Sequence, residues 1–151
     1  MSNWHQKFLG LAKHISTWSK DSTKVGAVII DPETNTIIGI GYNGFPRGVN
    51  DAQDRIDHKE TKYKLTVHAE VNAILNSNRS VRGCDLYVYP TMMVPPCCPD
   101  CAKAVTNAGI RNVYGYANEN LSERWEELSG WTKILFDEGG VKFFCEEVEQ
   151  K

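Results

Sequence analysis

Helical patterns alternate with strand patterns between residues 68 and 116, and this alternation constrains the fold more than any other feature of the chain. HAEVNAILN (68–76) and CAKAVTNAG (101–109) have helical patterns, and Gly109 is placed to end the second helix. CDLYVYP (84–90) and IRNVYGY (110–116) are typical of strands. The alternation predicts an α/β fold in which these later strands are parallel and joined by helical crossovers.

The N-terminal part adds a helix and a hairpin. Apolar residues from Trp4 to Trp18 recur at steps of three and four residues, which predicts an amphipathic core helix. VGAVIID (25–31) and TIIGIGY (36–42) are β-branched runs separated by four residues, and they predict an antiparallel hairpin at the edge of the sheet. Because both runs are almost continuously apolar, we expect both strands to be buried on both faces.

The remaining segments complete a single domain. Residues 43–66 are rich in Gly, Asp, Lys and Arg, lack periodicity and exceed the usual connection length, so we expect a functional loop. Residues 121–136 are expected to form a helix broken at Gly130, and VKFFCEEV (141–148) is expected to form a last strand. With no repeat or linker, the length of the chain predicts one domain over residues 1–151.

The charge balance bears on the class of partner. The formal net charge is -2 and the isoelectric point is about 6.1. A protein that holds a nucleic-acid backbone usually concentrates Lys and Arg to neutralise phosphates, so this balance argues against a nucleic-acid partner. It is compatible with a small pocket for one phosphate, which needs only one or two cations.

The cysteines favour a metal site over disulfides. Their number is odd and three of them are crowded together, which is a poor disulfide framework. The five are Cys84, Cys97, Cys98, Cys101 and Cys145. We therefore expect a reducing, cytoplasmic setting. The first residues lack the pattern of a secretory signal and no apolar run approaches membrane-spanning length, so we expect neither export nor a membrane partner.

Two short motifs carry the candidate chemistry. Cys98 and Cys101 lie three residues apart at the start of a predicted helix, so both thiolates can bind one ion. His68 adds a third ligand of a type that suits zinc. Three protein ligands leave one open position, where water becomes acidic enough to supply hydroxide. Glu70 can share this site with His68 only if both lie in the first turn of their helix.

Each motif has a simpler explanation when taken alone. A CxxC pair is often half of a structural zinc site or a redox pair, and an HxE triplet arises by chance in many proteins. Glu70 alone would be a solvated carboxylate favoured by the helix dipole. Cys97 could replace one ligand or supply a fourth, which would close the site; alternatively, it is a small buried residue. HxE followed by CxxC, each at a helix start, nevertheless combines ligands and proton shuttle as zinc deaminases do.

At this point a family resemblance becomes specific. VGAVIID, GYNGFPRG, HAEVNAIL and PCCPDCAKAVTNAGI together resemble the deoxycytidylate deaminase family of the cytidine deaminase-like superfamily, over most of the chain. The zinc motifs are shared across the superfamily, whereas GYNGFPRG after a VGAVI strand is typical of deoxycytidylate deaminases. The resemblance implies a three-layer α/β/α sandwich around a mixed five-stranded sheet. The family's proline normally precedes the first ligand cysteine, and here Cys97 takes that position.

The resemblance also implies a reaction. His68, Cys98 and Cys101 would bind Zn²⁺, and Glu70 would move a proton from the attacking water to N3 of cytosine and then assist the departure of ammonia. The reaction would convert dCMP to dUMP, which supplies thymidylate synthesis. We find no glycine-rich cofactor-binding motif of the GxGxxG or GxxxxGK type.

Further contacts are implied by the family's layout. Asn43, which also fits an ordinary Asn-Gly turn, and Ala69 would contact the substrate, and Lys24 and Tyr116 would contact its 5′-phosphate. Lys24 fits equally well as a solvated charge at a strand edge. Activation by dCTP and inhibition by dTTP, with Mg²⁺ accompanying the triphosphate, would occur in a homo-oligomer, usually a hexamer. The implied effector contacts are Asn43, Gly44, Arg47, Asn50, Asp51 and Glu60.

Two other functions remain open at this stage. A tRNA or polynucleotide deaminase shares the HAE and CxxC chemistry, although the acidic balance argues against it. A binding or assembly module with a closed structural zinc would use Cys97 or Cys84 as its fourth ligand.

Overall fold

A computed structural model gives the structure of residues 3–91, 93–116 and 123–146. The elements run in the order α1 (Asn3–Ser16), β1 (Gly26–Asp31), β2 (Thr36–Tyr42), α2 (Gln53–Asp57), α3 (Lys59–Leu65), α4 (Ala69–Asn76), β3 (Asp85–Tyr89), α5 (Pro99–Ala108), β4 (Asn112–Tyr116), α6 (Glu123–Gly139) and β5 (Lys142–Glu146).

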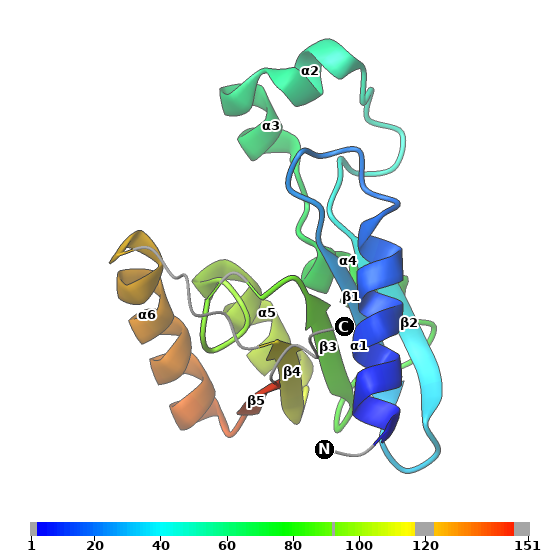
Figure 1. Cartoon of the computed structure of the whole chain (residues 1–151), viewed down its shortest axis with the longest axis vertical. Coiled ribbons are helices and arrows are strands. Elements are labelled where there is room, and N and C mark those ends of the chain that lie inside the picture. The colour runs from blue at the N-terminus through cyan, green and yellow to red at the C-terminus, as the bar shows by residue number, and fades with distance from the viewer. Residues whose placement is uncertain (1–2, 92, 117–122, 147–151) are drawn as a thin grey trace.

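The five strands form one mixed sheet in the order β2-β1-β3-β4-β5. β1 pairs with β2 and β3 in antiparallel fashion, whereas β3, β4 and β5 are parallel to one another. The hairpin therefore supplies the antiparallel edge, and the later strands are joined by helical crossovers through α5 and α6 (Figure 1). Both features confirm the sequence-based prediction.

Helices cover both faces of the sheet, which gives the predicted three-layer sandwich. Successive side chains of β1 point to opposite faces, as the pleat of a strand requires. Val28 and Ile30 pack in one core beneath α1, and Ala27 and Ile29 pack in another that also includes residues of α4, α5 and α6. Because the whole of β1 is sandwiched in this way, its near-continuous apolar sequence is explained.

Two expectations about burial were wrong. β2 is not buried on both faces: it forms the outer edge of the sheet, and Ile37 is half exposed. The helical stripe is also shorter than predicted, because α1 ends at Ser16. Trp4 and Trp18 are 47% and 48% exposed, and Leu9 is fully buried instead. Trp4 stacks on Phe8, and Trp18 packs edge-on against Tyr42. Both rings therefore have neighbours but remain half exposed at the ends of the pattern.

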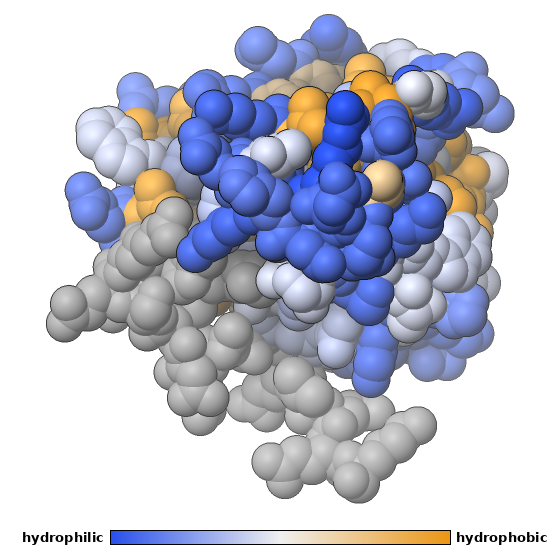
Figure 2. Space-filling view, turned by 90° about the horizontal axis from the view of Figure 1, so that it is seen from above, coloured by the Kyte–Doolittle hydropathy of each residue, from blue (hydrophilic) through white to orange (hydrophobic). Residues whose placement is uncertain are grey.

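Residues 43–66 are not an irregular loop throughout. They contain α2 and α3, which project beyond the end of the sheet as a small arm, here called the 53–65 arm (Figure 1). Neither helix contains a fully buried residue, which explains why the sequence shows no apolar periodicity there. Seen from above, the arm presents mainly hydrophilic residues (Figure 2).

The C-terminal prediction was right in outline. α6 runs without a break through Gly130, which is exposed and has open space around it. At such a position glycine costs only helix propensity, about 1 kcal/mol, which the rest of a 17-residue helix outweighs. β5 forms the last strand, as predicted. Residues 121–122 and 147–148 of the two predicted elements lie outside the described residues.

Gly41 fixes the distance between β2 and α4, the helix that carries the first motif. A Cβ at Gly41 would lie 2.3 Å from the amide nitrogen of Ala73 and 2.5 Å from the carbonyl oxygen of Ala69. Both are backbone atoms of α4, so neither can move without displacing the helix. Close approach of the two elements therefore requires glycine at this position.

We expect Gly41→Ala to lower the free energy of unfolding by about 1–3 kcal/mol or more, because it overpacks a backbone contact. Gly10→Ala is the matched control: nothing lies within 4 Å of the added Cβ in the middle of α1. That substitution should raise stability by about 0.5–1 kcal/mol. Urea unfolding of the two variants measures both effects. Equal stabilities would show that α4 does not depend on this close approach.

Candidate active site

His68 and Glu70 lie at the beginning of α4. His68 is the N-cap residue, with extended backbone angles, and Glu70 is the second residue of the helix. The preceding residue, Val67, forms an isolated bridge with Gly44, which ties the start of α4 to the end of the hairpin. In this position the two side chains can face one site although they lie only two residues apart, as the sequence analysis required.

Cys98 and Cys101 lie at the beginning of α5. Cys98 is the N-cap residue and Pro99 follows it, where its missing N–H costs nothing. The amide N–H of Cys101 donates to Cys98 Sγ at 3.5 Å, so the sulfur takes the role of a capping acceptor. At its other end α5 stops at Gly109, which has φ 83° and ends the helix as predicted.

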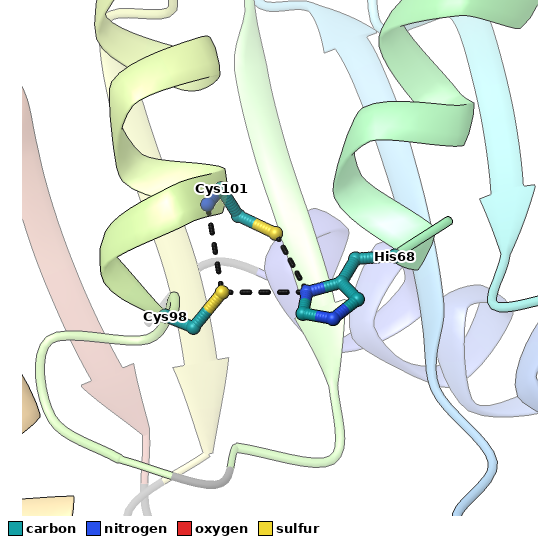
Figure 3. A group of neighbouring side chains, drawn as sticks. All are labelled: His68, Cys98 and Cys101. Carbon is teal, nitrogen blue, oxygen red and sulfur yellow. Dashed lines mark hydrogen bonds between the residues drawn. The ribbon is translucent and has the colours of Figure 1, made fainter. Parts of the chain in front are cut away.

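The two helix starts bring three metal-binding side chains together (Figure 3). His68 Nδ1 lies 3.1 Å from Cys101 Sγ and 3.3 Å from Cys98 Sγ. Zn–S bonds of about 2.3 Å and Zn–N bonds of about 2.0 Å separate such atoms by roughly 3.5 Å around a tetrahedral zinc. One nitrogen and two sulfurs at this spacing fit zinc. In the described part of the chain this is the single group of three or more potential ligands that converges in this way.

The pKa values of the three ligands shift in different directions. The hydrogen bond from Cys101, followed by contact with His68, lowers the pKa of Cys98 to about 4, despite the opposing effect of burial. The hydrogen bond with Cys98 raises the pKa of His68 to about 9. Hydrogen bonds to Cys97 and Cys98 raise the pKa of Cys101. Cys98 is thus the thiolate of the pair before a metal binds, and a divalent cation would displace the protons on the other two ligands.

Glu70 is buried beside this cluster, with only 5% of its surface exposed. Burial raises the pKa of its carboxyl group, and the nearby Cys98 raises it further. The Glu70 carboxylate is therefore a stronger base toward a nearby proton than the carboxylate of an exposed Glu. This is the behaviour expected of a proton shuttle.

Cys97 contacts both Glu70 and the ligand Cys101, but it is not one of the three converging ligands. It is buried, and its thiol donates to Glu70 Oε2 at 3.6 Å. A hydrogen bond with Cys101 lowers the pKa of Cys97, but burial and the charges of Glu70 and Cys98 together raise it to about 12. It is not among the converging ligands, and Cys84 lies elsewhere, near Arg79. Among the described residues the site therefore keeps the three-ligand form of a catalytic zinc.

A cavity of about 260 Å³ opens beside the cluster. Its lining includes His68, Glu70 and Cys98. Apolar side chains form much of the remaining wall, namely Val25, Val88, Pro90, Met93 and Pro96. A mainly apolar cavity with a few polar groups at one end is the usual form of a small-molecule site.

Two of the four predicted substrate contacts line this cavity. Ala69 is buried in the wall, and Asn43 is 7% exposed. The side chain of Asn43 also holds the neighbouring loop: Oδ1 accepts from the amide of Val25 at 2.9 Å, and Nδ2 donates to the carbonyl of Thr23 at 2.7 Å. Asn43 therefore fixes the shape of the cavity wall, and an ordinary Asn-Gly turn does not account for its role.

Lys24 and Tyr116 are placed outside the lining of the cavity. Lys24 is exposed, and its amine donates to the carbonyl oxygen of Ser19. Tyr116 donates its backbone N–H to Thr91 Oγ1 at 2.7 Å, and Thr91 is itself part of the lining. Lys24 is thus adjacent in sequence to lining residues, and Tyr116 contacts a lining residue through its backbone. Their contacts with a phosphate stay predictions.

The predicted effector residues divide into two groups. Asn43, Gly44 and Asp51 line a second cavity of about 130 Å³. The other three are exposed residues outside its lining and have other partners. Arg47 donates to Asn76 Oδ1, Asn50 accepts from the amide of Ala52, and Glu60 pairs with Lys64.

The sequence analysis missed an ion pair that lines both cavities. Lys62 Nζ lies 3.1 Å from Asp21 Oδ1, and the two side chains are only 13% and 10% exposed. Forty-one positions separate them, and neither belongs to a motif. No local pattern could have paired them, because only the position of the 53–65 arm brings α3 against the loop that follows α1.

Comparison with known sequences gives consistent matches. The family model described as "Cytidine and deoxycytidylate deaminase zinc-binding region" matches residues 2–117. The chain is 40% identical to an Aliivibrio fischeri protein named "Uncharacterized deaminase in luxG 3'region", over 94% of this chain and 92% of that protein. It is 37% identical to the deoxycytidylate deaminase of Homo sapiens, over 93% of this chain and 78% of that protein.

Solved structures support the same fold. The dCMP deaminase of cyanophage S-TIM5, solved in complex with dCMP and dUMP, matches with a TM-score of 0.70. The match covers 98% of this chain and 99% of that one at 24% sequence identity, so it bears on the fold alone. None of the helices in the described part of the chain combines the length and apolarity of a membrane-spanning helix.

Proposed function

The chain belongs to the zinc-binding cytidine and deoxycytidylate deaminase family and is a deaminase, and we propose that it hydrolyses dCMP to dUMP and ammonia. The observation that carries the proposal is the three-ligand cluster of His68, Cys98 and Cys101 beside the buried Glu70. The relatives named deoxycytidylate deaminase, at 37% to 38% identity, support the choice of substrate.

The chemistry divides between metal and protein. When bound at the cluster, zinc supplies a Lewis acid that makes water reactive near neutral pH. Glu70 accepts a proton from the attacking water and delivers it to N3 of cytosine, as the C4–O bond forms. Glu70 then transfers the proton of the new C4 hydroxyl to the amino group, the C4–N bond breaks as the C4 carbonyl forms, and ammonia leaves. One carboxylate therefore serves first as base and then as acid. Burial raises its pKa, which suits a group that must take up a proton.

The other residues position the substrate in this proposal. Asn43 and Ala69 form part of the wall against which the nucleotide packs. Lys24 and Tyr116 are retained as proposed contacts for its 5′-phosphate, since the exposed Lys24 side chain is long enough to change its partner.

Regulation is a second part of the proposal. The second cavity, lined by Asn43, Gly44 and Asp51, would take the activator dCTP or the inhibitor dTTP, with Mg²⁺ on the triphosphate. Arg47, Asn50 and Glu60 would reach the effector from the surrounding surface. We further propose a cytoplasmic homo-oligomer, usually a hexamer in this family, that supplies dUMP for thymidylate synthesis.

A deamination assay across phosphorylation states tests the substrate. Zinc-loaded protein is incubated with dCMP, deoxycytidine and a cytosine-containing oligonucleotide, and loss of the cytosine absorbance is followed. We expect dCMP to give the highest kcat/KM. A preference for the oligonucleotide would favour the polynucleotide deaminase instead. Repeating the dCMP assay with dCTP and with dTTP tests regulation, and a flat response to both would remove that part of the proposal.

A further inference from the structure

The cavity beside the metal cluster has one lysine in its wall. Among the described residues that line it, Lys62 is the single Lys or Arg. It comes from α3, whereas the metal ligands come from the starts of α4 and α5. The cation and the reacting centre therefore belong to different elements around the same cavity, as recognition of the two ends of a nucleotide requires.

Lys62 is held in place rather than free in solvent. Its ammonium donates to Asp21 Oδ1 at 3.1 Å, and the same oxygen accepts from the amide of Thr23 at 2.9 Å. The Lys62 carbonyl accepts from the hydroxyl of Thr66 at 2.6 Å. Both Thr23 and Thr66 also line the cavity. A partly buried ammonium fixed in this way loses little conformational entropy when a ligand binds, and salt screens it less than a surface charge.

The neighbouring Lys64 on α3 is in a different environment. Lys64 lies two residues further along the helix and pairs with Glu60 at 3.2 Å, with both side chains 73% exposed. Lys62 is only 13% exposed. Residues two apart point in different directions on a helix, so one lysine faces the cavity and the other faces solvent.

We propose that Lys62, positioned by Asp21, binds the 5′-phosphate of the substrate and makes the enzyme specific for a nucleotide over a nucleoside. This inference rests on the proposed function, because it assumes a cytosine nucleotide in the cavity. A phosphate carries about 1.5 to 2 negative charges near neutral pH. When it hydrogen bonds to Lys62 it lies nearer to the ammonium than to the Asp21 carboxylate, so attraction outweighs repulsion.

Binding of the product and its dephosphorylated form tests the inference. Calorimetry on the zinc-loaded protein measures the affinities for dUMP and for deoxyuridine. We expect Lys62→Met to weaken dUMP binding by roughly 10- to 100-fold, the contribution of a hydrogen bond to a charged group. Deoxyuridine, which has no phosphate, should keep its affinity. Lys64→Met is the matched control on the same helix and should change neither affinity.

The double variant Asp21→Asn with Lys62→Met tests the proposal even if Lys62→Met alone does not fold. It removes the carboxylate that Lys62→Met alone would leave nearly buried without its cation, and it should show the same selective loss of dUMP binding. An unchanged ratio of the two affinities in both variants would overturn the assignment. Equal weakening of both ligands would also overturn it, since that would indicate a structural role. A wild-type protein that binds neither ligand and leaves dCMP intact contradicts the proposed function itself, which is a separate result.

Discussion

Replacing Glu70 by Gln is expected to lower kcat for deamination by about 10³- to 10⁴-fold. General acid–base catalysis by one positioned group typically contributes roughly 10² to 10⁴, and Glu70 is proposed to act in both proton transfers. Gln has the same shape, and its side-chain oxygen can still accept from Cys97, so the buried environment is preserved. It cannot accept and return a proton. Steady-state assays with dCMP measure the loss.

Two measurements separate this loss from a damaged site. Zinc content should stay near one ion per chain, because Glu70 is not among the converging ligands. The affinity for dUMP should change by no more than a few-fold. A Glu70→Gln variant with nearly normal kcat would rule out the carboxylate as the proton shuttle and leave the buried, raised-pKa group without a catalytic role.

Cys98→Ala is expected to remove zinc and, with it, deaminase activity. Structural zinc sites contribute about 10 to 16 kcal/mol through four ligands, so the loss of one of three should cost several kcal/mol. Metal affinity would then fall by roughly 10² or more, and purified protein should contain little zinc. Cys98 also caps α5 through its sulfur, so a smaller loss of stability should accompany the loss of metal. Elemental analysis and the dCMP assay measure the two effects.

Cys97→Ala is the matched control, since Cys97 is adjacent in sequence and similarly close to the site. Its thiol donates to Glu70, and it does not belong to the converging ligands. We therefore expect normal zinc content and a change in kcat that reflects the lost contacts of Cys97 with Glu70 and Cys101. Loss of zinc in Cys97→Ala would identify Cys97 as a fourth ligand. The site would then be closed, which a hydrolytic zinc cannot be.

Local spacing in the sequence was sufficient to predict each half of the metal site, whereas the convergence of the two halves depends on the fold. Cys98 and Cys101 are neighbours on any helix that begins at the first of them, whatever lies around it. The requirement that His68 and Glu70 lie in a first turn also follows from helix geometry, and the structure confirms it. Alternation of strand and helix patterns predicted the order of the elements and the parallel half of the sheet for the same reason: each element is encoded within about ten residues.

Only the tertiary structure shows which charged residues line the cavity. The family resemblance implied Lys24 and Tyr116 as phosphate contacts, and these stay predictions. No sequence pattern pointed to Lys62, which lies in the cavity lining beside Asp21. The tertiary structure also decided that Trp4 is half exposed and that residues 53–65 form a helical arm. These outcomes depend on where an element ends relative to its neighbours and on pairs more than forty positions apart. Such contacts are set by packing in three dimensions, and no periodicity along the chain records them.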